Sequence, residues 1–361
     1  MSDITREPFS FIGEKIRFGL FGKSHGPCIG CVLEGIPEGT VIDESLIAED
    51  LALRKPSKGI GTDRKEEDRA VIVSGVKDGV ADGSPIRIEI ANQNTDGSKY
   101  LEFQTKPRPG HADLPALIKM PDFDIRGGGQ FSGRLTAAVV AAGAVAKCVI
   151  RDKGIRIGAF CRSISTITDS EERSIEDSLR SRSFPTRACT AELDAAMSDE
   201  IMAARNDGDS VGGVVECIIT GLPIGFGGIW FESLDAELAH AVFGIPACKG
   251  VEFGKGFAIT SMRGSQSNDG YRIVDGKIVT ESNNMGGIVG GMSDGQPVVF
   301  RAAFKPTPSI AKSQHTVDLE NECNTDLEIK GRHDPCIAPR AVPVVEAVAA
   351  LVIADQMERG L

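Results

Sequence analysis

Three of the five histidines lie in short segments rich in glycine, proline and arginine, where loops are expected. These are His25, His111 and His333, whereas His240 lies in a predicted helix and His315 in a polar stretch. Histidine changes its charge near neutral pH, so histidines in loops are candidates for proton transfer. Their spacing is not that of metal ligands, and no acidic cluster accompanies them. We therefore predict a proton-transfer site and no metal.

Lysines and arginines gather in the same loops, although the chain carries a formal net charge of −11. These cations are Lys23, Arg54, Lys55, Lys58, Arg108, Arg126, Arg134, Lys305, Arg332 and Arg340. Arginine forms paired hydrogen bonds with phosphate or carboxylate. An acidic protein with cationic loops is suited to a small ligand that carries several negative charges. Histidines beside such an anion should have raised pKa values.

Charge and composition argue against two other kinds of partner. The chain is acidic and has no basic block with interleaved aromatic residues, so nucleic acid is not expected to bind. Its apolar runs fall short of the ~20 residues that span a bilayer, so no membrane segment is expected. Nine dispersed cysteines without a secretory leader favour a reduced, cytoplasmic location. Cys28 and Cys31 form a single C-x-x-C pair, which fits the core of a strand better than a zinc site.

A glycine loop with an arginine at each end, residues 126–134, precedes an apolar run from Leu135 to Ile150 that contains no acid. Such a run predicts a helix buried on most of its circumference, with Ser132 as its N-cap. Unpaired N–H groups at the start of this helix could hold a phosphate. The alternative is a tight turn that needs glycine dihedral angles.

Hydrophobic pattern and turn residues predict the elements that position these loops. Strands are expected at 15–20, 28–33, 71–74 and 85–91, and helices at 44–54, 191–205, 234–243 and 341–356. Asp43 should cap the first of these helices. The charged segment 55–69 is expected to be a mobile loop.

Three signals occur twice in the same order. Gly35-Ile36-Pro37-x-Gly39 returns at 221–225, the Asp-Gly turn at 82–83 returns at 294–295, and the loop before the buried helix returns at 331–336. We therefore predict one domain, 1–361, with pseudo-repeats at roughly 10–160 and 208–358 joined by a polar, solvated segment at 161–207. Two buried helices would then pair between two sheets in a sandwich, in contrast to a parallel βαβ array.

Six motifs occur in one order along the chain. They are Gly22-Lys23-Ser24-His25-Gly26, Arg108-Pro109-Gly110-His111-Ala112-Asp113, Arg126-Gly127-Gly128-Gly129, Gly286-Gly287-Ile288-Val289-Gly290-Gly291, Lys305-Pro306-Thr307 and Gly331-Arg332-His333-Asp334-Pro335-Cys336. Together they closely resemble the chorismate synthase family, over residues 19 to 355. The resemblance implies an α+β fold, a β-α-β sandwich with central helices between two antiparallel sheets, internally duplicated.

The resemblance also implies a reaction. Phosphate would be removed from 5-enolpyruvylshikimate 3-phosphate by anti-1,4-elimination to give chorismate, in the shikimate pathway of aromatic amino acid biosynthesis. The family needs reduced FMN although its reaction has no net redox change, and NADPH is a candidate reductant. Substrate and FMN both carry phosphate, so both are chemically suitable ligands for the cationic loops. A homotetramer is implied by kinship alone.

Residue roles follow from the same resemblance, position by position. His25, with Ser24 beside it, corresponds to the residue that protonates the reduced flavin. His111 corresponds to the acid that assists the departing phosphate. Asp334 corresponds to the aspartate that works with the flavin to remove the C6 hydrogen, and Ser132 to a hydroxyl near flavin and substrate.

The implied ligand contacts form two sets. FMN contacts are expected from Arg54, Gln130, Phe131, Ser132, Pro246, Ala247, Gly290, Lys305, Pro306, Thr307, Pro308, Ser309 and Arg332. Substrate contacts are expected from Arg54, Lys58, Arg108, Arg134 and Arg340.

Some positions depart from the family pattern. Gln130 and Phe131 replace an arginine and a serine, and Pro246 stands where asparagine is common. The segment after Pro56 is one residue short and lacks an arginine near Ile60, for which Lys58 is the candidate substitute.

Two other functions stay open at this point. An FMN-dependent oxidoreductase acting on an anionic phosphorylated substrate would use the same pocket, but the chain has no nicotinamide-binding fingerprint. A non-catalytic phosphosugar or flavin-binding protein would not need His25, His111 and Asp334 together.

Overall fold

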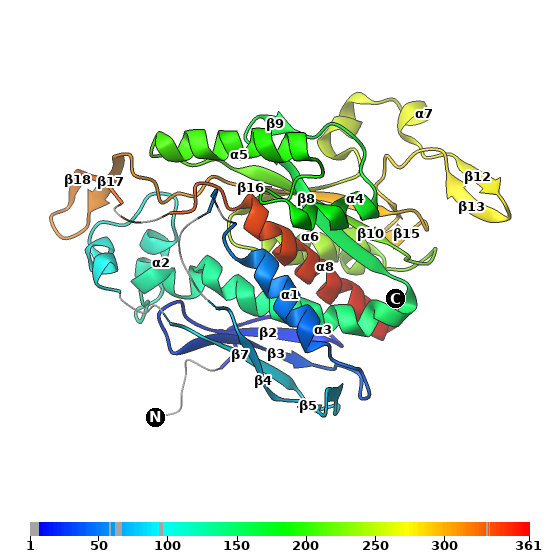
Figure 1. The fold of residues 1–361 in the computed structure, drawn as a ribbon, viewed down its shortest axis with the longest axis horizontal. Helices are drawn as coiled ribbons and strands as arrows, with labels where there is room; N and C mark the ends of the chain where they lie inside the picture. Colours follow the sequence, from blue (N-terminus) through cyan, green and yellow to red (C-terminus); the bar gives the residue numbers. More distant parts are fainter. Residues whose placement is uncertain (1–6, 58, 62–66, 94–96, 330, 332) are drawn as a thin grey trace.

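Two five-stranded antiparallel sheets enclose a layer of helices in the computed structural model (Figure 1). The structure describes residues 7–57, 59–61, 67–93, 97–329, 331 and 333–361. The first sheet has the order β1-β2-β3-β7-β4 and the second the order β11-β16-β10-β8-β9. Their strands are β1 Ser10–Ile12, β2 Arg17–Gly22, β3 Cys28–Glu34, β7 Ile86–Ala91, β4 Ala70–Ser74, β11 Cys248–Phe253, β16 Val298–Phe304, β10 Gly213–Thr220, β8 Arg156–Ile164 and β9 Ile167–Thr168.

The central layer consists of α3 (Thr136–Ile150) and α8 (Ala338–Arg359), with α1 (Glu44–Arg54) packed against both and α6 (Leu234–Phe243) against α8. The two central helices approach closely, because a Cβ atom on Gly143 would lie 2.3 Å from the Cβ of Ala347. Residues 133–153 have the length and hydropathy of a membrane span, but they form helix α3 and its flanking turns in the core. Of the most apolar 18 residues in this range, 78% are buried.

The two halves share one topology. Strands β2-β3-β7-β4 in the first sheet correspond to β8-β10-β16-β11 in the second, with α1 matching α6 and α3 matching α8. The hairpin β5 (Val76–Lys77) and β6 (Val80–Ala81) precedes β7, as β14 (Ile288–Val289) and β15 (Met292–Ser293) precede β16. We infer that the halves are copies of one unit. The bounds near 10–160 and 208–358, and the single domain, stay predictions.

The segment 161–207 packs more closely than a solvated linker would. Its first residues complete β8, while α4 (Ile175–Arg180) and α5 (Ala191–Asn206) follow it. Ile175 and Cys189 pack with Phe160 and Ile218 in a separate apolar cluster. Figure 1 shows α5 on the outer side of the second sheet, so this segment covers the sheet face that points away from the central helices.

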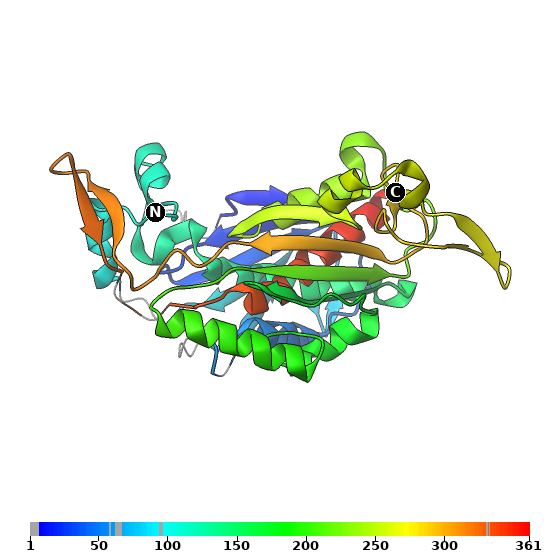
Figure 2. The same ribbon diagram turned by 90° about the horizontal axis from the view of Figure 1, so that it is seen from above.

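The remaining elements lie at the periphery. Figure 2 shows two hairpins that project at opposite ends of the molecule, β12–β13 and β17–β18. The peripheral elements are β12 Tyr271–Val274, β13 Lys277–Thr280, β17 Gln314–Asp318, β18 Cys323–Leu327, α2 Asp113–Lys119 and α7 Gly264–Ser267, with 3-10 turns η2 Ser98–Gln104, η3 Arg126–Phe131, η4 Gly133–Leu135, η5 Arg151–Lys153, η6 Ser181–Ser183, η7 Trp230–Glu232 and η8 Gly256–Ser261.

Several local predictions are confirmed. Helix α1 has the predicted bounds, and the Asp43 side chain accepts hydrogen bonds from the first-turn N–H groups of Ser45 and Leu46. Cys28 and Cys31 are buried in β3.

Candidate active site

Several predicted site residues lie where α1 ends and α3 and α8 begin, namely Arg54, Arg134, Asp334 and Arg340. At this point two arginines from different elements share one buried carboxylate. Arg54, the last residue of α1, and Arg134, just before α3, both form ion pairs with the carboxylate of Asp68. All three side chains are almost completely buried. Burial opposes ionisation of Asp68, but Arg54 and Arg134 outweigh it and hold the pKa of this carboxyl below its usual value.

The same network reaches Asp334, the predicted partner in hydrogen removal. Arg340, in the first turn of α8, pairs with Asp334 and donates from Nε to the backbone oxygen of Arg54 at 3.1 Å. Burial and the nearby charge of Arg340 lower the pKa of Arg54. Asp334 is therefore fixed to the same arginine cluster that is expected to bind the substrate.

His25 lies against the glycine loop. Gly127, Gly128 and Gly129 have φ angles of 60°, 82° and 54°, so all three adopt left-handed conformations that favour glycine. A Cβ atom on Gly127 would lie 2.2 Å from Nδ1 of His25, so glycine is required there for contact as well as for backbone shape. On another side, the ring of His25 meets Tyr100 edge to face, with 5.4 Å between the ring centroids.

Of the two interpretations of the glycine loop, the tight turn is confirmed, and phosphate binding at the start of α3 stays a prediction. The turn forms a wall beside His25. Ser132 caps the 3-10 turn η4 by accepting from the N–H of Arg134 at 3.3 Å, whereas the N-cap position of helix α3 itself is Leu135, so the predicted cap lies one turn earlier. Phe131, which replaces a serine of the family pattern, is 47% exposed and packs edge to face on Phe123.

His111 is held from both sides of its ring. Nδ1 lies 3.2 Å from the carbonyl oxygen of Pro109 and Nε2 lies 2.8 Å from the hydroxyl of Ser309. A carbonyl can only accept, so the neutral ring carries its proton on Nδ1, and Nε2 accepts from Ser309. Burial, followed by the charges of Arg108 and Lys305, lowers the pKa of His111 to about 4. In the protein alone the shift is therefore opposite to the predicted rise, because burial and the two cations outweigh the Pro109 hydrogen bond and the Asp113 charge, which act to raise this pKa.

Arg108 forms a buried ion pair with a carboxylate of its own loop. Its Nε and Nη2 donate to the two carboxylate oxygens of Asp113 at 2.7 and 2.8 Å. The guanidinium also lies over the rings of Phe103 and Tyr100. In this structure Arg108 braces the loop that carries His111, and its contact with substrate stays a prediction.

The predicted FMN contacts at 305–309 lie beside His111. Nζ of Lys305 donates to the carbonyl of Gly110 at 3.1 Å, and its backbone N–H donates to the carbonyl of Ala247 at 3.0 Å. Residues 246–247 and 305–309 are thus neighbours. The Thr307 hydroxyl and the Gln130 amide oxygen are buried without a hydrogen-bond partner among the described residues. An unpaired buried hydroxyl two residues from Lys305 can donate to a bound polar anion such as FMN, whereas the Gln130 amide oxygen can only accept.

One predicted contact lies elsewhere. Gly290 joins β14 to β15 at the start of β16, whereas Lys305 follows the end of β16. A seven-residue strand spans roughly 20 Å, so a single chain does not bring Gly290 to the 305–309 loop. Lys58 and Arg332 lie outside the described residues, and their predicted contacts stay predictions.

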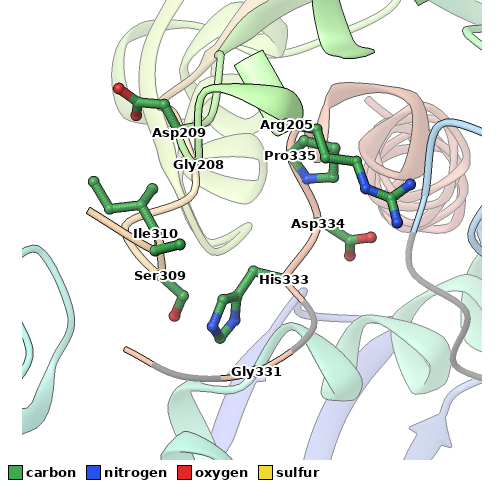
Figure 3. A pocket seen from close by; sticks show the side chains of 10 residues that line it. Arg205, Gly208, Asp209, Ser309, Ile310, Gly331, His333, Asp334 and Pro335 are labelled. Carbon is green, nitrogen blue, oxygen red and sulfur yellow. The ribbon is translucent and has the colours of Figure 1, made fainter. Parts of the chain in front are cut away.

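A cavity of about 230 Å³ adjoins these residues (Figure 3). Asp334 and Pro335 lie across it from Ser309 and Ile310, and His333 lies between them (Figure 3). The rest of its lining comes from the end of α5 and the loop after it, Arg205, Gly208 and Asp209, with Ala311 and Gly331. The linking segment 161–207 therefore contributes to the site, which its composition did not indicate.

Three residues that organise the site were not predicted: Asp68, Asn92 and Asp113. Asp68 was assigned to a mobile charged loop, and because it directly follows Glu66 and Glu67, nothing in the sequence singles it out as the buried partner of two arginines. Asn92 is a polar residue directly after a strand, which is where site residues often lie. Asp113 belongs to the motif of Arg108, and a spacing of five residues allows the pair.

The site combines buried arginines, two positioned histidines and an aspartate, beside the N-termini of two helices. This combination defines an enzyme that acts on a small polyanion. The chorismate synthase family model matches residues 16–357. A chorismate synthase of Pyrococcus abyssi is 45% identical over 96% of this chain and 96% of its own length. One of Aeropyrum pernix is 46% identical over 95% of this chain and 91% of its own. A crystal structure of a chorismate synthase, 30% identical, covers 97% of this chain with a TM-score of 0.78.

The chain belongs to the chorismate synthase family. It is a phosphate-eliminating lyase of aromatic amino acid biosynthesis, and this assignment sets aside the oxidoreductase and the non-catalytic binding protein. The family uses reduced FMN.

Proposed function

We propose that His111, Ser309 and Lys305 receive the phosphate that leaves 5-enolpyruvylshikimate 3-phosphate. The observation that carries this proposal is the 2.8 Å contact between Nε2 of His111 and the Ser309 hydroxyl, beside the Lys305 ammonium. A hydroxyl, an ammonium and an imidazole are all suited to phosphate oxygens. Their convergence on one loop pair supports a leaving-group site.

His111 must hold a proton on Nε2 to act as the acid. In the protein alone its pKa is lowered to about 4, so the ring is neutral near pH 7. A dianionic phosphate beside the ring would favour the charged imidazolium and raise this pKa. Substrate binding would therefore protonate His111, which could then donate this proton to the departing phosphate. Protonation would then be coupled to substrate binding.

This coupling predicts a titration. At pH 6 the His111 ring should be neutral in the protein alone, and saturating inorganic phosphate should raise its pKa by about 1–3 units, enough for measurable protonation. Ring-proton NMR shifts, assigned with His111→Asn, would measure this. The ring signals of the exposed His315 should not respond to phosphate. A His111 titration that is unchanged when phosphate is bound would contradict the proposed role.

The other roles follow from position. Arg54 and Arg134 would bind the anionic groups of the substrate, and Arg340 would hold Asp334 where it can accept a proton from the substrate. His25 and Ser24 would donate a proton on the flavin side. When bound, reduced FMN supplies electron density to the reacting substrate without net redox change. Residues 246–247 and 305–309, with Gln130, would hold it.

Three finer assignments rest on kinship. We propose NADPH as the source of electrons for the flavin, a homotetramer as the assembly, and the cytoplasm as the location. The nine cysteines support the last of these, because all are free and eight are buried.

A further inference from the structure

We propose that Asn92 is a positioning residue that fixes the His25 loop and Arg134 relative to one another. Asn92 directly follows β7 and is partly buried. Its Nδ2 donates to the carbonyl oxygens of Lys23 and Gly26, at 2.9 and 2.8 Å. Its Oδ1 accepts from Nε of Arg134 at 3.2 Å. One side chain thus joins the loop on both sides of His25 to an arginine of the substrate site.

The contacts require an amide. The two carbonyl oxygens can only accept and the Arg134 Nε–H can only donate, so the side chain between them must donate on one side and accept on the other. Asparagine does both. Aspartate could still accept from Arg134 but would place a carboxylate oxygen against two carbonyl oxygens. Alanine would remove both sets of contacts.

The backbone around Asn92 is held separately. Its N–H donates to the Pro27 carbonyl at 3.1 Å, and Nη2 of Arg134 donates to the Ala91 carbonyl at 3.2 Å. Replacing the side chain should therefore leave the end of β7 in place. The effect should fall on the loop that contains His25, which Gly127 contacts closely from another side.

The contact also extends the arginine network. Arg134 shares Asp68 with Arg54, and the Arg54 carbonyl accepts from Arg340, the partner of Asp334. Asn92 therefore connects the predicted flavin-side histidine to the predicted hydrogen-removing aspartate through substrate-binding arginines. This inference rests on the proposed roles of His25 and Arg134.

The test distinguishes the role of the Asn92 Nδ2 donor from that of its Oδ1 acceptor. Asn92→Asp should keep KM for 5-enolpyruvylshikimate 3-phosphate within about threefold of the unmodified enzyme, because Arg134 keeps its acceptor. Its kcat should fall about 10- to 100-fold, because small displacements of a catalytic group have effects of this size. Asn92→Ala should raise KM as well as lower kcat. Both would be assayed anaerobically with chemically reduced FMN, after circular dichroism has confirmed folding.

Asn284→Asp is the matched control. The Nδ2 of Asn284 also donates to two carbonyl oxygens, those of Gln266 and Ser267, both at 3.3 Å. Its kcat and KM should be unchanged. An Asn92→Asp enzyme with unchanged kcat, or with KM and kcat altered together as in Asn92→Ala, would overturn this inference alone. An unmodified enzyme without turnover would remove the proposed function and this inference together. If Asn92→Asp does not fold, an Asn92→Ala enzyme with unchanged kinetics would overturn the inference equally.

Discussion

Replacing His111 by alanine is expected to lower kcat by about 10²- to 10⁴-fold, the usual contribution of a positioned general acid. The ring is held between Pro109 and Ser309, so its Nε2 points to one defined place in the site. Removing it takes away the imidazole that would donate a proton to the departing phosphate. FMN should still bind, because Lys305 and Thr307 remain. Single-turnover phosphate release and flavin fluorescence would measure the two effects independently.

His315→Ala serves as the control for histidine loss, because this side chain is 99% exposed on the β17–β18 hairpin. It should retain normal turnover. The same experiment with His25→Ala tests the flavin-side role. Two folded alanine variants at positions 25 and 111 that bind FMN and turn over normally would show that the assigned proton-transfer roles are wrong.

Replacing Glu346 by alanine is expected to lower the free energy of unfolding by about 3–5 kcal/mol, the usual effect of breaking a buried ion pair. Glu346 lies within α8 and accepts from Lys147 at 2.9 Å, Arg182 at 2.7 Å and the Ala159 N–H at 2.9 Å. Burial opposes its ionisation, but Lys147 and Arg182 outweigh this and lower its pKa. Without Glu346, Lys147 would still pair with Asp50, but Arg182 would lose its ion pair with Glu346.

Urea denaturation followed by circular dichroism would measure this loss. Glu176→Ala is the matched control, because it breaks an ion pair with Arg156 that is exposed on both sides. Exposed pairs contribute little to stability, so its transition midpoint should barely move. A Glu346→Ala midpoint as close to normal as that of Glu176→Ala would mean that this buried network does not stabilise the sandwich.

Local features of the fold were predictable from sequence. Helices α1 and α6 have the predicted bounds because capping residues and apolar spacing act within one helix. The three glycines of the 127–129 turn were predicted for the same kind of reason, since left-handed backbone is a local requirement. The repeated Gly-Pro signals also led to the paired central helices.

Features that depend on distant residues were not predictable. The pKa of His111 depends on burial and on Lys305 from a distant loop, as well as on nearby Arg108, and the Nε2 partner of His111 is Ser309 from that same distant loop. Asp68 looked like part of a mobile charged segment, because nothing nearby shows that Arg54 and Arg134 converge on it. Which loops meet is decided by sheet order and helix packing, and these are tertiary properties.

The most direct test of the central claim is an anaerobic assay of the purified protein with 5-enolpyruvylshikimate 3-phosphate and chemically reduced FMN. Chorismate absorbance and phosphate release would be followed together, and then again with NADPH and oxidised FMN. We predict equal amounts of chorismate and phosphate under reduction. Activity in the second mixture would assign flavin reduction to the same protein. A folded, flavin-bound protein that releases neither product would contradict the account.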